Sequence, residues 1–197
     1  MSFRRSLPLL LLYHLTIHAQ GGFLSESSSG DLSNNWQAPS VLAIDHGSNF
    51  VSGTTTLDDP DLFSVHVPNG LEIIEVRVAF YDFFAPGNFT FMGFQDGPTL
   101  LQDPAAFTAD SSEDISFILF GEFDQGTDML PIFSSSPNAT SGSLGEGSYA
   151  FWINEIEPQT VTYAFDFVAD VAPVPEPGTL ALFGVALPLL LRRRRSN

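Results

Sequence analysis

Three acidic residues within four positions, Asp58, Asp59 and Asp61, form the densest cluster of acids in the central part of the chain. They precede a stretch of alternating apolar residues, so we expect them on a loop that enters a strand. Hard cations such as Ca²⁺ bind several carboxylate and carbonyl oxygens on irregular loops, which makes this turn a candidate calcium site. Glu26 and Asp31 would join it if the N-terminal segment folds back. The alternative is a solvated acidic turn that binds no ion.

No motif in the sequence indicates catalysis. The chain has no cysteine, which excludes thiol catalysis and cysteine metal sites. His46 and His66 lie outside any metal or triad spacing, and we expect both at the surface. The glycines of 145–150 fit a nucleotide-binding pattern, but no helix pattern follows, so a hairpin turn explains them better. Paired carboxylates, on which a glycosidase depends, arise by chance in an acid-rich chain. We expect a non-enzymatic protein.

The charge distribution excludes several partners. The chain has 7 basic and 23 acidic residues, but six of the basic residues lie near its two ends. Residues 22–174 hold 22 acids and a single base, Arg77, which is a formal charge of −21. Such a body repels nucleic acid and anionic membrane surfaces and suits divalent cations, high salt or a cationic partner. Solubility through self-repulsion is the simpler explanation of the same charge.

The C-terminal segment has three parts. Pro175, Glu176 and Pro177 form an extended, exposed tripeptide, since proline fixes φ and removes amide donors. The uncharged run 179–191 reads as a helix of 13 residues, about 20 Å long, which is short against a hydrocarbon core of about 30 Å. The run ends in four arginines, which orient that end toward the cytoplasm. These arginines are Arg192, Arg193, Arg194 and Arg195.

These three parts resemble the PEP-CTERM sorting signal of bacterial envelope proteins. The resemblance implies recognition by an exosortase, a membrane protease-transpeptidase, with cleavage near the tripeptide and transient residence in the inner membrane. It also implies a Gram-negative source and a neighbouring exopolysaccharide system. Pro188 and the shortness of the apolar run depart from the family pattern, which leaves full spanning open.

The N-terminus has the features of a secretory signal peptide. Arg4 and Arg5 form a positive region, the apolar stretch 7–12 follows, and Ala19 and Gly21 frame a small-x-small cleavage site. We expect ordinary Sec export in preference to the twin-arginine route. The predicted organisation is a signal peptide at 1–21, one domain at 22–172 and a sorting segment at 173–197.

The body reads as all-β. Period-2 alternation bounded by Gly, Pro, Asn and Asp predicts short strands within 63–67, 74–81, 89–93, 115–120, 149–154 and 161–167. Asn69-Gly70 predicts a hairpin turn between the first two. We expect an antiparallel, jelly-roll-like β-sandwich, flanked by a signal helix and a short C-terminal hydrophobic helix, with no helix longer than about two turns in the body. The predicted core contains Phe63, Val65, Val76, Val78, Phe151, Phe165 and Phe167.

Three segments of the body resemble the bacterial pre-peptidase C-terminal domain. They are Gly47–Gly53, Asp59–Gly70 and Gly145–Ile153, which match that family's turn, its Asp-x-Asp strand and its Gly-x-Gly-x-Tyr strand. The resemblance implies a jelly-roll-like sandwich that serves secreted enzymes as an accessory or binding module.

Two functions remain open. The first is an exported envelope or matrix protein, sorted by an exosortase and associated with exopolysaccharide or biofilm. The second is a secreted carbohydrate- or protein-binding module that calcium would stabilise. An exposed aromatic platform would favour this function, and Trp36, Tyr81 and Trp152 are the candidate residues for it. Trp152 alternates with Tyr149, Phe151 and Ile153, so it is either exposed or fills a second buried face.

Overall fold

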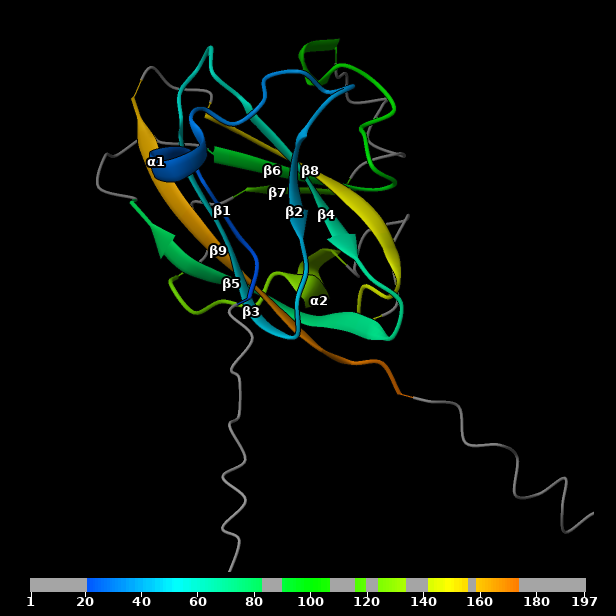
Figure 1. Cartoon of the computed structure of the whole chain (residues 1–197). Coiled ribbons are helices and arrows are strands. Elements are labelled where there is room, and N and C mark those ends of the chain that lie inside the picture. The colour runs from blue at the N-terminus through cyan, green and yellow to red at the C-terminus, as the bar shows by residue number, and fades with distance from the viewer. Residues whose placement is uncertain are drawn as a thin grey trace, which may run out of the picture.

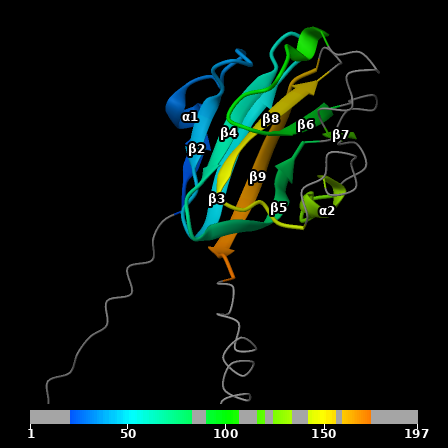
Figure 2. The same cartoon turned by 90° about the vertical axis from the view of Figure 1, so that its right-hand side faces the viewer.

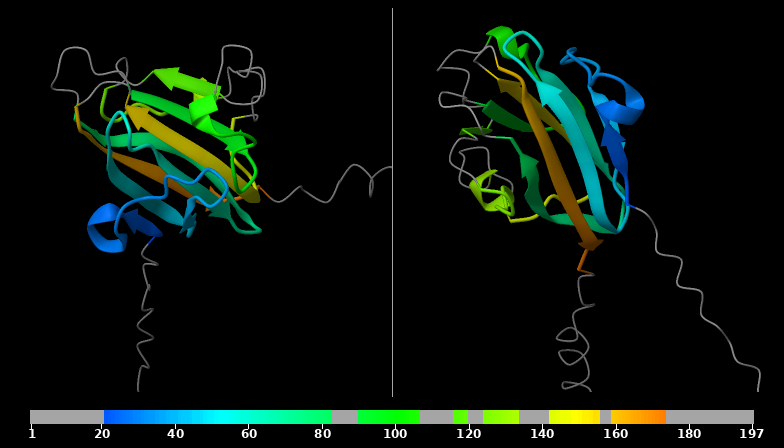
Figure 3. Two further views of the ribbon diagram at one scale, coloured as in Figure 1. Left: turned by 90° about the horizontal axis from the view of Figure 1, so that it is seen from above. Right: turned by 90° about the vertical axis from the view of Figure 1, so that its left-hand side faces the viewer.

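The protein folds into two β-sheets packed face to face (Figures 1 and 3). The computed structural model describes residues 21–82, 90–106, 116–119, 124–133, 142–155 and 159–173. One sheet has the strand order β1-β3-β9-β5 and the other β2-β4-β8-β6-β7. The strands are β1 (Phe23–Ser25), β2 (Ser40–Ala43), β3 (Gly47–Thr55), β4 (Asp61–Val67), β5 (Leu71–Tyr81), β6 (Thr90–Asp96), β7 (Ser116–Leu119), β8 (Gly147–Glu155) and β9 (Val161–Val171).

Helix is confined to short turns among the described residues. These are α1 (Glu26–Ser29), the 3₁₀ turn η1 (Pro104–Ala106) and α2 (Leu130–Phe133). The prediction of a β-rich body without long helices is therefore confirmed for this part of the chain. The sheets are antiparallel except at one edge of each, where β1 pairs in parallel with β3 and β2 with β4. The prediction of a wholly antiparallel sandwich is wrong at these two edges, because the N-terminal segment supplies an outer strand to each sheet.

Phenylalanine rings pack together with aliphatic side chains in the space between the sheets. Phe151 of β8 stacks on Phe63 of β4, with ring centroids 5.2 Å apart, and meets Phe167 of β9 edge-on at 5.2 Å. Aromatic pairs in such arrangements contribute about 0.5–1.5 kcal/mol beyond their buried area. All seven residues predicted for the core are fully buried.

Strand β5 departs from the predicted alternation. Its pairing with β9 shifts register between Ile73 and Glu75 and again between Val78 and Phe80. Each shift is a bulge, which moves the following side chain to the opposite face. Ile73, Val76 and Val78 are therefore buried, whereas Ile74 and Phe80 are exposed, contrary to the prediction.

One further expectation, the hairpin turn at Asn69-Gly70, is also corrected. The turn after β4 does not form a hairpin: the Leu71 amide bonds to the Pro68 carbonyl at 3.2 Å, but β4 and β5 belong to different sheets. Only Gly70 of the Asn-Gly pair has positive φ, as in a type II turn, whereas the favoured two-residue hairpin turn needs both. In β6 the buried apolar residues are Met92 and Phe94, whereas Phe91 is only half-buried.

The two ends of the described chain leave the sandwich at the same end (Figures 1 and 2). Phe23 pairs with Phe50, and Gly47 pairs with Ala169 near the end of β9. The opposite end of β3, at Thr55, pairs with Val161. We call this opposite end, with α1, the turn 56–60 and η1, the distal end.

Candidate metal centre

Three carboxylates meet at the distal end. They belong to Glu26 of α1, to Asp31 just after it, and to Asp61 at the start of β4, and one oxygen of each lies within 4.8 Å of the others. Asp61 is completely buried, Glu26 is partly buried and Asp31 is exposed. The parallel pairing of β1 with β3 brings α1 and the following loop to the start of β4, so the N-terminal segment folds back, which was the condition for Glu26 and Asp31 to join the site.

The hydrogen bonds at this cluster leave two oxygens without a protein partner. The Tyr163 hydroxyl donates to Oδ2 of Asp61 at 2.7 Å. The amide and the hydroxyl of Thr54 donate to Oε2 of Glu26 at 2.8 and 2.9 Å. Oδ1 of Asp61 and Oε1 of Glu26 are buried and accept no hydrogen bond. Because a buried, unpaired carboxylate oxygen is costly, this arrangement calls for a proton or a cation.

A glycine makes room for this cluster. Gly53 of β3 pairs with Tyr163 of β9. A Cβ at Gly53 would lie 2.7 Å from the Tyr163 hydroxyl and 2.9 Å from Oε1 of Glu26, closer than real Cβ atoms approach. The absence of a side chain at Gly53 therefore leaves the space into which the side chains of Glu26 and Tyr163 pack.

The electrostatics agree with a site that lacks positive charge. Burial, with the charges of Glu26 and Asp59 adding to it, raises the pKa of Asp61 to about 8 against an opposing effect of the Tyr163 hydrogen bond. Burial and the charges of Asp59 and Glu26 also raise the pKa of Asp31. Burial and the neighbouring Asp61 hold the pKa of Tyr163 well above its ordinary value. A bound divalent cation would favour the ionised carboxylates.

The structure brings together only part of the predicted ligand set. Asp61 belongs to the cluster, and so do Glu26 and Asp31, which the sequence offered as additional ligands. Asp58 and Asp59 do not: Asp59 accepts a hydrogen bond from Asn34 at 2.9 Å, and Asp58 faces a separate groove. Sequence proximity grouped the three aspartates, but the strand geometry sends Asp61 into the sandwich and leaves the other two in the turn.

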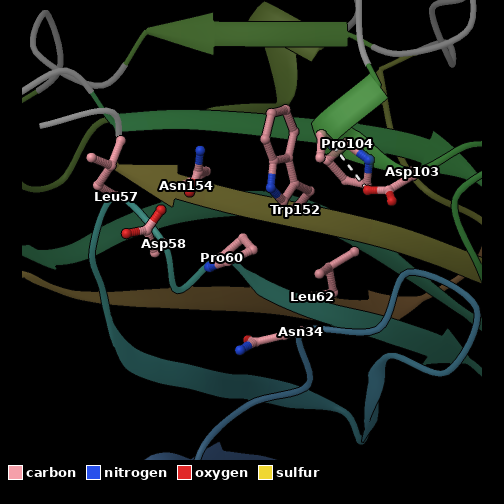
Figure 4. A pocket seen from close by; sticks show the side chains of 10 residues that line it. Asn34, Leu57, Asp58, Pro60, Leu62, Asp103, Pro104, Trp152 and Asn154 are labelled. Atoms are coloured by element: carbon pink, nitrogen blue, oxygen red, sulfur yellow. Dashed lines mark hydrogen bonds between the residues drawn. The ribbon is translucent and has the colours of Figure 1, made fainter.

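The groove lies beside the turn 56–60, on the outer face of the β4–β8 sheet (Figure 4). Its volume is about 330 Å³, and its walls come from Asn34, from the turn, from residues 103–105 and from β8. Trp152 stands in this groove but is only 7% exposed, since it packs with Leu62, Leu100 and Ala150 in a second apolar cluster. Of the two alternatives that the alternation left open for Trp152, an exposed platform or a second buried face, the structure shows the buried face.

The two other candidate platform residues are also engaged. Trp36 is half-buried against the second apolar cluster. Tyr81 is half-buried and donates its hydroxyl hydrogen bond to Thr90. An aromatic surface for stacking is therefore not formed by these three side chains.

The histidines and the single base of the body lie on the surface. His46 is 3.3 Å from a carboxylate oxygen of Asp170. His66 is exposed and bonds to the Ser148 hydroxyl at 3.1 Å, directly across the β4–β8 pair. Among the residues that the structure describes, no carboxylate orients His66, so this pair is not a triad. Arg77 binds Glu75 and lies 3.6 Å from Asp166.

The sorting and processing residues lie almost wholly outside the described ranges. Only Gly21 of the signal cleavage site is described, and the predicted signal helix and C-terminal helix both fall beyond these ranges. Across the described ranges, no helix combines the length and the apolar character needed to cross a bilayer. The sorting and processing residues that lie outside the described ranges are Ala19, Pro175, Glu176, Pro177, Arg192, Arg193, Arg194 and Arg195.

Comparison with known proteins identifies the tail alone. Residues 173–195 match the family model described as the PEP-CTERM protein-sorting motif. No curated protein and no solved structure matches the chain. The motif implies exosortase-dependent sorting of an exported protein that is transiently anchored in the membrane before surface display.

Proposed function

We propose that this chain is a non-enzymatic protein of the cell envelope or extracellular matrix of a Gram-negative bacterium, exported through Sec and released from its anchor by an exosortase. The observation that carries this proposal is the sorting motif at 173–195, which begins where the described sandwich ends. Strand β9 ends at Val171, so cleavage near Pro175–Pro177 would remove the tail without breaking a strand.

The remaining chain would be a single displayed domain, with the jelly-roll-like form that its pre-peptidase resemblance implies. Its formal charge of −21 repels nucleic acid and anionic lipid, and it favours a hydrated polymer as the environment of the domain. Exopolysaccharide or biofilm is the setting that we propose, with the exosortase as processing partner.

Calcium is the cofactor that we propose for this domain. The supporting observation is the fully buried Asp61, whose free Oδ1 lies beside the Glu26 and Asp31 carboxylates. Ca²⁺ accepts six to eight oxygen ligands in irregular geometry, so three carboxylates with backbone oxygens and water suit it. Bound there, the ion would fasten the N-terminal segment to β4.

The sorting proposal is tested by intact-mass analysis of the protein recovered from the envelope and the medium. The expected product lacks about the first 20 residues and everything after the Pro-Glu-Pro region. A Glu176→Ala variant should accumulate in the membrane with its arginines retained, whereas Glu146→Ala, a change of the same kind in the body, should be processed normally. A mature species that keeps Arg192–Arg195 in the wild type would overturn the proposal.

A further inference from the structure

We infer that the groove at the distal end binds a short segment of an uncharged polysaccharide through the hydroxyl groups of its sugars. This inference rests on the proposed matrix function and names the ligand class and the site. The groove has a volume of about 330 Å³. That is at the lower end of the about 300–1,000 Å³ typical of small-molecule sites, which suits part of a chain rather than a large ligand.

The rim of the groove offers hydrogen-bond acceptors. Asp58 and Asp103 supply carboxylates at the rim. Asn154 also lines the groove, and its Oδ1, which has no hydrogen-bond partner, is buried in the wall and not at the rim. Asp58 is exposed and projects from the turn. A row of acceptors is matched by a ligand rich in O–H donors, and a sugar presents several on each ring. Hydrogen bonds to ionised carboxylates are about twice as strong as those between neutral groups.

The floor is apolar. Leu62 and the edge of Trp152 form it, and Pro60 and Pro104 flank it (Figure 4). Such a floor can contact the C–H faces of sugar rings, although the 7% exposure of Trp152 rules out stacking over its whole face. A few polar groups placed around apolar walls are the usual composition of a ligand site.

The charges of the groove exclude an anionic ligand. The body has one basic residue, Arg77, and its guanidinium is engaged by Glu75 and Asp166 on the other sheet. Nothing in the described part of the groove could neutralise a uronate, sulfate or phosphate group beside Asp58 and Asp103. An uncharged polymer carries no such repulsion, and its binding should depend little on salt.

The position of the groove fits a displayed binding site. Both ends of the described chain leave at the opposite end of the sandwich (Figure 2). While the protein is held by its tail, the groove therefore lies at the end away from the attachment. The turn 56–60 lies between the groove and the acid cluster, and Asn34 lines the groove and bonds to Asp59 of this turn.

The test is affinity gel electrophoresis of the processed protein with three uncharged polymers (dextran, a β-glucan and a galactomannan) and with alginate as the anionic comparison. We expect at least one uncharged polymer to retard the wild type, at low and high salt alike, and alginate to have no effect. Asp58→Ala and Asn154→Ala should each weaken the retardation at least tenfold. Asp45→Ala removes an exposed carboxylate near the other end of the sandwich and should bind as the wild type does.

Thermal melting of each variant confirms that it is folded, so that loss of binding is not loss of structure. Absence of retardation by all three uncharged polymers, equal retardation by alginate, or unchanged binding by both groove variants would each overturn the inference. The groove variants should still be exported and cleaved, because the sorting tail is unaltered. Failure of the inference that the groove binds polysaccharide and failure of the sorting proposal therefore give different results.

Discussion

Replacing Asp61 by asparagine should stabilise the calcium-free protein and abolish its response to calcium. The change removes a carboxyl group that must take up a proton or bind a cation on folding, but it keeps the shape of the side chain. Asparagine can still accept the hydrogen bond from the Tyr163 hydroxyl, which reaches Asp61 at 2.7 Å. Its amide group can also donate to Oε1 of Glu26, which otherwise has no partner.

The size of the effect follows from the raised pKa of Asp61. The folded pKa is about 8 against an ordinary value of 3.8. At about pH 7.5, burying this group without a cation costs roughly 5 kcal/mol, because each unit above the ordinary pKa is worth about 1.4 kcal/mol. This pKa already includes the effect of the hydrogen bond from Tyr163, so nothing further is subtracted for that bond. A stabilisation of about 5 kcal/mol raises Tm by roughly 10–20 °C for a domain of this size.

The assay is thermal and urea unfolding in EDTA and in millimolar Ca²⁺, with NaCl of matched ionic strength as the salt control. The wild type should gain stability from Ca²⁺ beyond the NaCl effect, about 2.7 kcal/mol at a hundredfold excess over Kd. Asp61→Asn should show no such gain. Asp58→Asn, a loss of the same charge outside the cluster, should keep it. A destabilised Asp61→Asn protein in EDTA, or one that still responds to Ca²⁺, would refute the reasoning.

Three further predictions follow from the same contacts. Tyr163→Phe removes the donor to Asp61 and should destabilise the protein by about 1–3 kcal/mol in urea unfolding; an unchanged midpoint would contradict the role of this bond. In EDTA, stability should fall as the pH rises from about 4 to about 8, since the raised Asp61 pKa favours the protonated folded state, and Ca²⁺ should remove this loss; stability that rises across that range would oppose it. Asn49→Ala deletes a buried side chain that bonds to Gly22, Asp45, Gly47 and Phe167, so it should lower Tm by more than 5 °C, whereas Asn35→Ala at the surface should change it little.

The sandwich core could be predicted because apolar residues occupy every second position in the strands that face it. Phe63, Val65, Phe151, Phe165 and Phe167 alternate with other residues and are all buried. Strand β3 has no such signal: its inward positions are Asn49, Val51, Gly53 and Thr55, three of which are not apolar. Its burial is recognisable only once β9 is placed beside it. The bulges of β5 were equally hidden, because each depends on its pairing with β9.

The candidate site was only partly predictable for a related reason. Proximity in sequence suggested Asp58, Asp59 and Asp61, whereas proximity in space selects Asp61 with Glu26 and Asp31. The parallel pairing of β1 with β3 decides this, and a three-residue edge strand leaves little trace in a sequence. Gly53 is the one sequence signal for the site, since a glycine inside a strand often marks a close approach of other groups.

Native intact-mass measurement of the protein recovered from the cell surface tests the account most directly, since it reports processing and bound metal together. The account predicts a species that lacks the signal peptide and everything after the Pro-Glu-Pro region and that carries one calcium ion, which EDTA removes. A surface species that retains Arg192–Arg195, or a processed one that never carries calcium, would contradict it.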